Sequence, residues 1–257
     1  MKKIFKKIIL LNKKEGETPL EALEKFRLTN KKYKDVKMTY AGRLDPMATG
    51  LLLVLAGEET KNKEKYLNLP KQYEFEILFG VATDTYDILG KITTAPPRQR
   101  LGGKKELENE IKNNLKYLTG KFMQKYPPYS SKTVKGKPLF QYAREDIDVE
   151  IPKREVFVKE LKFFKLRKIN NTKLLVSTEK RVKKVKGDFR QGEIIKTWKK
   201  NLNTGRLLAK ENFYIGSFKI KCSSGTYVRG IAHSLGVLIN ISALAFSIKR
   251  TKIGNWR

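Results

Sequence analysis

Runs and alternations of apolar residues predict several strands distributed along the chain. Residues 51–56 form an unbroken apolar run, which is typical of a strand buried on both faces. Residues 73–79 alternate, so that every second side chain from Tyr73 to Phe79 lies on one side of a second strand. Shorter apolar stretches predict further strands at residues 8–11, 156–166, 174–177, 217–222 and 245–248.

Helices are predicted between these strands. Thr18, Pro19 and Glu21 form a helix start, with a side-chain cap, a proline in the first turn and a glutamate that can bond back to the cap. Because strands and helices follow each other without regular alternation, the predicted fold is α+β, with a mixed, mainly antiparallel sheet flanked by helices. The other predicted helices are a polar helix from Gly57, a charged helix over 104–118 ended by Gly120, and a helix over 226–238.

The composition favours one large domain, or one domain with a small appendage, and a polyanionic partner. The chain has 257 residues, and 56 Lys and Arg against 26 Asp and Glu give a net charge of +30. Its single cysteine, Cys222, excludes an internal disulfide and a multi-cysteine metal site. Its single histidine, His233, makes a His-cluster metal site or Ser-His chemistry a poor interpretation.

The positive charge is concentrated in two segments. Residues 162–210 hold sixteen Lys and Arg against Glu179, Asp188 and Glu193. Residues 121–144 hold six basic and no acidic side chains, interleaved with aromatic residues, and are predicted to be a basic loop. Such clustering indicates a nucleic-acid footprint rather than a proteome that is basic throughout, which is the alternative. A membrane surface fits less well, because no basic amphipathic helix stands out.

The start of the chain resembles a signal peptide only superficially. Its apolar stretch, residues 8–11, is too short for the hydrophobic region of a signal peptide, and no run reaches the roughly 18 residues of a membrane helix. We therefore expect a cytoplasmic protein that contacts no membrane and no metal.

One loop-like segment carries the most chemical information. In residues 39–50, two glycines flank Leu44-Asp45-Pro46, and a buried strand follows at once. Pro46 restricts Asp45 to an extended conformation, so the loop can present a lone carboxylate rigidly to a substrate. Spacing alone leaves open that Asp45 merely caps backbone N–H groups in an ordinary turn.

The segment Ala41-Gly-Arg-Leu-Asp-Pro-Met-Ala-Thr-Gly-Leu-Leu52 resembles the catalytic motif of the TruB family of tRNA pseudouridine synthases. The resemblance extends over most of the chain and implies the pseudouridine synthase fold. Other motifs of that family are matched in the expected order by residues 9–18, 71–85, 127–137 with 142–145, 222–229 and 248–251.

The resemblance implies that Asp45 is the catalytic carboxylate. The reaction breaks the N1–C1′ bond of a uridine, rotates the uracil and joins C5 to C1′. Asp45 would act on the ribose by bonding to C1′ or by a route through a glycal. The family's chemistry implies that no cofactor or metal is needed.

Other residues are assigned by the same resemblance. Tyr73 matches the tyrosine that stacks on the uracil, and Arg229 matches the arginine that pairs with the aspartate. Each has a plainer alternative: Tyr73, Tyr227 and Ile248 could be core residues, Arg229 could contact phosphate, and the lysines could be solvated. The remaining substrate-binding candidates are Tyr227, Ile248, Tyr40, Lys132, Lys135 and Lys137, and the motif residues expected to support the loop are Lys13, Gly16, Gly42, Pro46 and Gly50.

Four departures from the family pattern stand out. Tyr40 replaces a histidine that helps to hold the flipped base, and Asn12 and Lys14 replace an Asp and a Pro in the opening motif. Residues 180–213 have the character of a basic insertion. We expect one catalytic domain over residues 1–257 without a counterpart of the family's C-terminal PUA domain, and hypothesise that the basic segment partly replaces the PUA grip on tRNA.

The sequence thus predicts a monomeric enzyme that converts the T-loop uridine of tRNA (position 55) to pseudouridine, with the tRNA T-arm as partner. The alternative is a non-catalytic RNA-binding or RNA-folding factor on the same scaffold. A third possibility is modification of ribosomal RNA.

Overall fold

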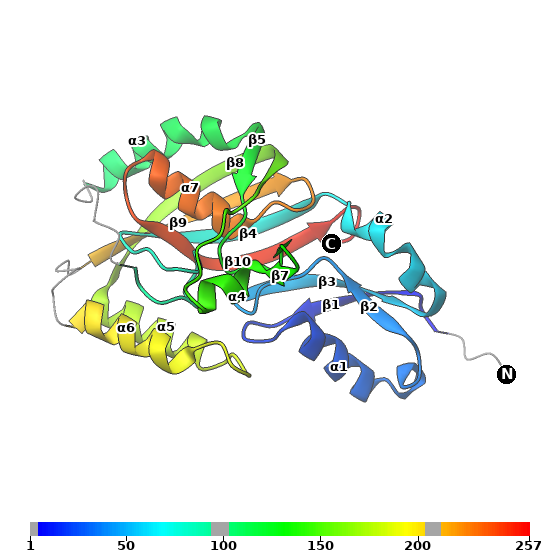
Figure 1. Ribbon diagram of the computed structural model, residues 1–257. Helices are drawn as coiled ribbons and strands as arrows, with labels where there is room; N and C mark the ends of the chain where they lie inside the picture. The colour runs from blue at the N-terminus through cyan, green and yellow to red at the C-terminus, as the bar shows by residue number, and fades with distance from the viewer. Residues whose placement is uncertain (1–4, 94–102, 204–211) are drawn as a thin grey trace.

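A central sheet of eight strands organises the computed structural model, which describes residues 5–93, 103–203 and 212–257 (Figure 1). Its strands are β1 (Ile8–Lys13), β2 (Met38–Ala41), β3 (Ala48–Ala56), β4 (Lys71–Phe79), β5 (Gly120–Lys125), β8 (Lys153–Asn170), β9 (Asn212–Cys222) and β10 (Ala243–Ile253). A separate small hairpin consists of β6 (Thr133–Val134) and β7 (Lys137–Pro138).

The strand order is β1, β3, β10, β4, β9, β8, β5, and β2 pairs with β3 beside this series. Strands β3 and β10 are parallel, with Ile248 opposite Ala48, whereas the other pairs of this sheet are antiparallel. This arrangement confirms the predicted α+β fold with a mainly antiparallel sheet. It also places the end of the chain beside the start of β3, directly after the loop that contains Asp45.

Helices lie on both faces of the sheet (Figure 1). The predicted cap of α1 is confirmed, because the Thr18 side chain accepts from Glu21 N and the Glu21 side chain accepts from Thr18 N. The helices are α1 (Pro19–Thr29), α2 (Lys63–Leu67), α3 (Lys104–Asn114), α4 (Leu139–Arg144), α5 (Asn171–Val182), α6 (Gln191–Asn203) and α7 (Val228–Leu238), with 3-10 turns η1 (Lys31–Tyr33), η2 (Gly57–Asn62) and η3 (Leu115–Leu118).

The alternation in β4 divides the core into two layers. Tyr73, Phe75, Ile77 and Phe79 pack in one layer with buried residues of α3 and α7. Leu78 points to the opposite face, where it packs with the buried side of α5 and α6. The sheet therefore holds α7 on one face and the α5–α6 hairpin on the other, and both reach the site described below.

The prediction of a strand at residues 174–177 is wrong, because these residues lie inside α5. Asn170 caps this helix by accepting from Lys173 N. Leu174, Thr178 and Val182 are buried at a spacing of four residues, which is a helical period. A short apolar run fits a strand and a buried helical turn equally well, so local pattern could not separate them.

Several predicted strands are longer in the structure, and other elements also differ from the predictions. The segment after Gly57 begins as a 3-10 turn, and the charged helix becomes 3-10 at Leu115. Residues 121–144 are not one basic loop, since they contain most of β5, the β6–β7 hairpin and α4.

The segment predicted as a basic insertion is largely a folded helical hairpin, apart from residues 204–211, which lie outside the described part of the chain. Trp198 of α6 is fully buried, and its indole donates to Gly90 O at 3.0 Å. The hairpin therefore belongs to the hydrophobic core. Within the described ranges, no helix has the length and apolar character needed to cross a membrane.

Candidate active site

A cavity of about 710 Å³ opens where the β2–β3 loop, the start of α7 and the α5–α6 turn meet. Residues from both ends of the chain line it, among them Thr18 and Ile248. Many of its lining residues belong to the segments singled out in the sequence. Asp45, Tyr73, Tyr227, Arg229, Tyr40 and Ile248 all line this cavity, together with Gly42 and Pro46.

The loop that carries Asp45 is held by the last residue of β1 and by the segment that follows this strand. The buried Lys13 ammonium donates to Pro46 O at 3.2 Å and also to the carbonyls of Lys14 and Glu17. Gly16 N donates to the same Pro46 carbonyl at 2.9 Å. Burial lowers the pKa of Lys13 to about 8. Two separate donors thus fix the residue that follows Asp45.

A buried arginine holds the other side of the loop. Arg250 of β10 donates to the carbonyls of Leu51, Arg43 and Gly42 at 2.7, 3.2 and 3.2 Å. Gly50 makes this approach possible, because a Cβ atom there would lie 2.3 Å from the Arg250 carbonyl oxygen, and its φ is +98°. The loop is therefore anchored through backbone carbonyls on both sides of Asp45.

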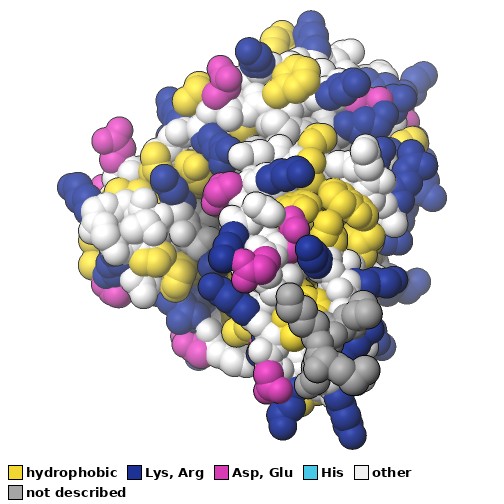
Figure 2. All heavy atoms as spheres, turned by 90° about the vertical axis from the view of Figure 1, so that its right-hand side faces the viewer, with side chains coloured by type: hydrophobic (Ala, Val, Ile, Leu, Met, Phe, Trp, Pro, Cys, Tyr) yellow, Lys and Arg dark blue, Asp and Glu magenta, His cyan; other side chains and the backbone are white. Residues whose placement is uncertain are grey.

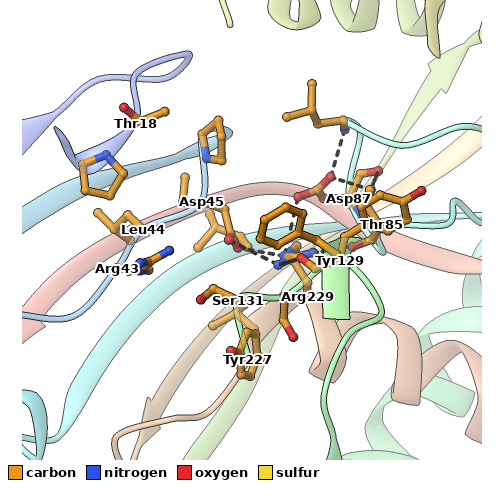
Figure 3. Close-up of a pocket in the computed structure, with 18 of the residues that line it drawn as sticks. Thr18, Arg43, Leu44, Asp45, Thr85, Asp87, Tyr129, Ser131, Tyr227 and Arg229 are labelled. Atoms are coloured by element: carbon orange, nitrogen blue, oxygen red, sulfur yellow. Dashed lines mark hydrogen bonds and ion pairs between the residues drawn. The ribbon is translucent and has the colours of Figure 1, made fainter. Parts of the chain in front are cut away.

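Asp45 faces a guanidinium in a bidentate arrangement (Figure 3). Arg229 Nε donates to Asp45 Oδ2 at 2.7 Å, and Nη2 donates to Oδ1 at 3.2 Å. The arginine side chain is 4% exposed, whereas that of Asp45 is 38% exposed. The carboxylate is therefore fixed from the protein side and open to the cavity, as an attacking group must be.

Arg229 is held by three further groups. Its Nη1 donates to Thr85 O at 2.5 Å, and its Nη2 donates to Tyr129 O at 3.3 Å. A second carboxylate, Asp87, lies 3.6 Å from Nε. Burial alone would lower the pKa of Arg229, but the charges of Asp45 and Asp87 raise it above its ordinary value. The guanidinium is thus a permanent cation with a fixed orientation.

Asp87 is the buried partner in this group of charges. Its Oδ1 accepts from Thr85 Oγ1 at 2.8 Å and from Leu89 N at 2.9 Å. Burial raises the pKa of Asp87 to about 6, against the opposing effect of the Arg229 charge. Sequence reasoning did not identify this residue. The signal that could have found it is a lone acid before the apolar pair Ile88-Leu89.

Aromatic and apolar side chains form the wall that could receive a flat base. Tyr73 and Ile248 are buried, and both also belong to the main core. Burial raises the pKa of Tyr73 and that of Tyr227, so both phenols are neutral donors near neutral pH. The ring of Tyr227 packs edge-on against Tyr126, with centroids 5.5 Å apart. Tyr40 lines the outer part, and the Lys63 ammonium lies 5.9 Å from its ring centroid.

The three predicted substrate-contacting lysines lie outside the cavity. The Lys132 ammonium lies 5.7 Å from the ring centroid of Tyr126. The Lys137 ammonium lies 5.0 Å from the ring centroid of Tyr142 and pairs with Glu145. Lys135 is exposed at the turn of the β6–β7 hairpin. None of the three is among the described residues that line the cavity. They are placed to contact only a ligand that extends beyond the cavity.

The remaining polar features do not form a metal centre. Across the described ranges, no group of three or more His, Cys, Asp or Glu side chains is arranged to hold a metal ion. His233 stacks on Tyr86, with parallel rings 3.8 Å apart, and does not line the cavity. Around Arg229, the cavity offers Asp45 as the accessible carboxylate, the cation paired with it, neutral phenols and apolar walls. These groups suit nucleophilic or acid–base chemistry on an uncharged ring and its sugar.

Residues 29–184 match the family described as TruB family pseudouridylate synthase (N terminal domain). The tRNA pseudouridine synthase B of Caldicellulosiruptor saccharolyticus is 31% identical over 96% of this chain, and that of Lactobacillus gasseri is 33% identical over 95%. The chain covers 67% of each relative. A solved Cbf5-Nop10-Gar1 complex is similar over 97% of this chain, with a TM-score of 0.56 and 16% identity, and the chain spans 49% of the matched chain.

The fold and the site, together with these relatives, define a pseudouridine synthase, an isomerase that rearranges uridine within RNA. The family match covers more than half of the chain, and the curated relatives exceed 30% identity. The chain belongs to the TruB family.

Proposed function

We propose that this chain converts the T-loop uridine of tRNA, position 55, to pseudouridine, with Asp45 as the catalytic carboxylate. The observation that carries the proposal is the bidentate pair of Asp45 with buried Arg229 at the wall of a nucleotide-sized cavity. The pair fixes the orientation of the Asp45 carboxylate, and the exposed part of this side chain leaves it within reach of a ribose.

The reaction is an isomerisation and needs no external electron or group donor. The N1–C1′ bond breaks while Asp45 acts on the sugar, by bonding to C1′ or by a route through a glycal. The freed uracil turns in the cavity, and C5 bonds to C1′. C5 then loses its proton and N1 gains one, so atoms and charge balance. Tyr73 is positioned to stack on the uracil while it turns.

A uridine inside a folded loop must leave its stack to reach Asp45. Extrusion costs a few kcal/mol, which stacking on aromatic side chains and backbone contacts outside the pocket offset. Tyr73, Tyr126 and Tyr227 supply aromatic surface at the cavity. In this proposal Tyr40, which lines the cavity, stacks beside the extruded nucleotide in the role for which other family members use a histidine.

Affinity for the T-arm is proposed to come from the basic surface. Lys and Arg side chains are spread over the face shown in Figure 2. Each phosphate that they neutralise releases counterions and so favours binding. We propose that the chain acts as a monomeric catalytic domain, and that the α5–α6 hairpin supplies part of the grip on tRNA.

The substrate can be tested with three RNAs: a tRNA transcript, the same transcript with cytidine at position 55, and fragments of ribosomal RNA. Pseudouridine mapping by primer extension or mass analysis is expected to find product only in the first. Product found only in the ribosomal fragments would show that the substrate is ribosomal RNA and not tRNA. Tight RNA binding without product would favour an RNA-folding factor.

A further inference from the structure

The turn between α5 and α6 forms part of the wall of the active-site cavity. Asp188, Phe189 and Arg190 of this turn line the cavity with Asp45 and Arg229. The backbone of Arg190 has a φ of +61°. Residues other than glycine rarely adopt this conformation, and it usually marks a constrained position. The segment that the sequence predicted to be a basic insertion therefore reaches Asp45 and Arg229.

Arg190 contacts two different segments. Its Nη1 donates to Asp84 Oδ2 at 2.8 Å, and the side chains of this pair are only 13% and 21% exposed. Its guanidinium also lies over the ring of Tyr129, 4.2 Å from the centroid. A planar guanidinium can make both contacts at once, whereas a lysine ammonium cannot stack in the same way.

Both contacts lie next to the carbonyls that orient Arg229. Thr85, which follows Asp84 directly, accepts from Arg229 Nη1, and Tyr129 itself accepts from Nη2. Arg190 therefore ties together the two backbone segments whose carbonyls hold the catalytic guanidinium. A loose segment at either place would let Arg229 tilt away from Asp45.

A second bridge joins the same turn to the segment that carries Tyr129. Arg144 Nη1 donates to Asp188 Oδ2 at 3.1 Å, and Nη2 donates to Asp188 O at 2.6 Å. Tyr129 Oη in turn donates to Ala143 O at 3.1 Å. The turn thus contacts both ends of residues 129–144, through Arg190 at Tyr129 and through Asp188 at Arg144. The contact of Arg190 with Tyr129 is therefore part of a larger packed surface.

We propose that Arg190 is a positioning residue: through Asp84 and Tyr129 it fixes the two carbonyls that orient Arg229, and so couples the α5–α6 hairpin to Asp45. The inference rests on the proposed role of Asp45. It deepens that role, because it makes the hairpin part of the catalytic centre as well as a surface for RNA.

The kinetic test uses Arg190→Ala and Asp84→Asn, with Lys183→Ala as the control. Asp84 does not line the cavity, and Lys183 is an exposed cation of the same hairpin that pairs with Glu179. Both test variants are expected to lower the single-turnover rate on saturating tRNA about tenfold or more, and to change the Kd for tRNA less than about twofold. Arg190→Lys should recover part of the rate, and Lys183→Ala should keep all of it.

Other outcomes overturn the proposal. A higher Kd with an unchanged saturating rate would make Arg190 a phosphate contact. If Arg190→Ala lowers the single-turnover rate but Asp84→Asn does not, Arg190 acts on the substrate directly. Equal loss in Lys183→Ala, or a lowered melting temperature that accounts for the loss, would make the effect one of general stability.

A second readout does not depend on activity. The Nε–H signal of Arg229 in a nitrogen-15 NMR spectrum reports its bond to Asp45 in the free protein. Arg190→Ala is expected to shift or broaden this signal, whereas Lys183→Ala should not. An unmoved signal would overturn the positioning role. If the wild-type protein makes no product on any RNA, the proposed function fails, and this spectrum still decides the role of Arg190.

Discussion

Arg229 is bound by two carboxylates of different character. Asp45 is partly exposed and bonded in bidentate fashion, whereas Asp87 is buried and 3.6 Å from Nε. Asp87 Oδ1 accepts from Thr85 and Leu89. Asp87 therefore attracts the guanidinium by its charge, whereas the two hydrogen bonds from Nε and Nη2 go to Asp45. In this arrangement Arg229 orients Asp45, and Asp45 is the carboxylate that can reach a substrate.

Arg229→Lys should therefore be nearly inactive although the charge is kept. An ammonium can keep one contact, but it cannot bond both oxygens of Asp45 and two backbone carbonyls in one plane. We expect the single-turnover rate to fall on the order of 100-fold, about 2.7 kcal/mol in the barrier. The rate on saturating tRNA measures this, and a decrease of less than about threefold would contradict the role of the bidentate pair.

Asp87 predicts a pH dependence. Its pKa is raised from 3.8 to about 6, so the folded protein binds this proton more tightly than the unfolded chain. The group therefore destabilises the fold increasingly as the pH rises from about 4 to about 6.

Below pH 6 the negative charge of Asp87 beside Arg229 is neutralised, so the catalytic rate should fall as the pH drops through about 6. Asp87→Asn should be slower near neutrality and flat across this range, and an unchanged profile would exclude Asp87 as the group that titrates.

The motifs located Asp45, Tyr73 and Arg229, because contiguous residue patterns carry them. They could not locate Arg190, whose partners Asp84 and Tyr129 lie 106 and 61 residues away in sequence. Side-chain pairs of that kind depend on how the hairpin docks, which no local pattern encodes. The same limit applies to Lys132, Lys135 and Lys137, which share a motif with cavity residues but do not line the cavity themselves.

At the scale of elements, the parallel pairing of β3 with β10 positions the loop that carries Asp45. Gly50 pairs with Lys13 on one side and Arg250 on the other. The pattern predicted both strands, although it set both of them too short. It could not predict their adjacency, because about 200 residues separate them.

Gly50→Ala should disrupt this pairing. The added Cβ would lie 2.3 Å from the Arg250 carbonyl oxygen at a φ of +98°. We expect a decrease of about 2 kcal/mol or more in the free energy of unfolding, together with lower activity. Gly192→Ala, where a Cβ meets nothing within 4 Å, is the control and should stay within about 1 kcal/mol. Denaturant unfolding measures the stability of both variants. Equal stability of Gly50→Ala and Gly192→Ala would contradict the close packing of Gly50 against Arg250.

At the scale of the whole molecule, charge and core occupy different sides of the same hairpin. Trp198 and Leu174 are buried against the sheet, whereas Lys180, Lys186 and Lys196 face solvent. The sequence located the charge correctly in this region. It did not reveal that the segment also completes the core, so we expect that deleting the hairpin would unfold the domain.

Substitution of surface charges tests the grip on tRNA without that damage. Replacing Lys180, Lys186 and Lys196 by Gln should weaken tRNA binding and lower the salt slope, by up to about 0.9 for each phosphate that is no longer neutralised. The saturating rate should not change. The matched control replaces Lys105, Lys112 and Lys116, which are exposed at α3 and η3 on the other face of the sheet. Equal effects of the two sets on Kd and slope would contradict a specific role of the hairpin.

The most direct test of the account is pseudouridine formation by Asp45→Asn compared with the wild-type protein on the same tRNA transcript, with binding measured in parallel. Asparagine keeps the size of the side chain and removes its charge, so the fold and the RNA surface should survive. The account predicts product at position 55 from the wild type, no detectable product from Asp45→Asn, and similar tRNA affinity for both. Product formed by Asp45→Asn at a rate near that of the wild type would contradict it.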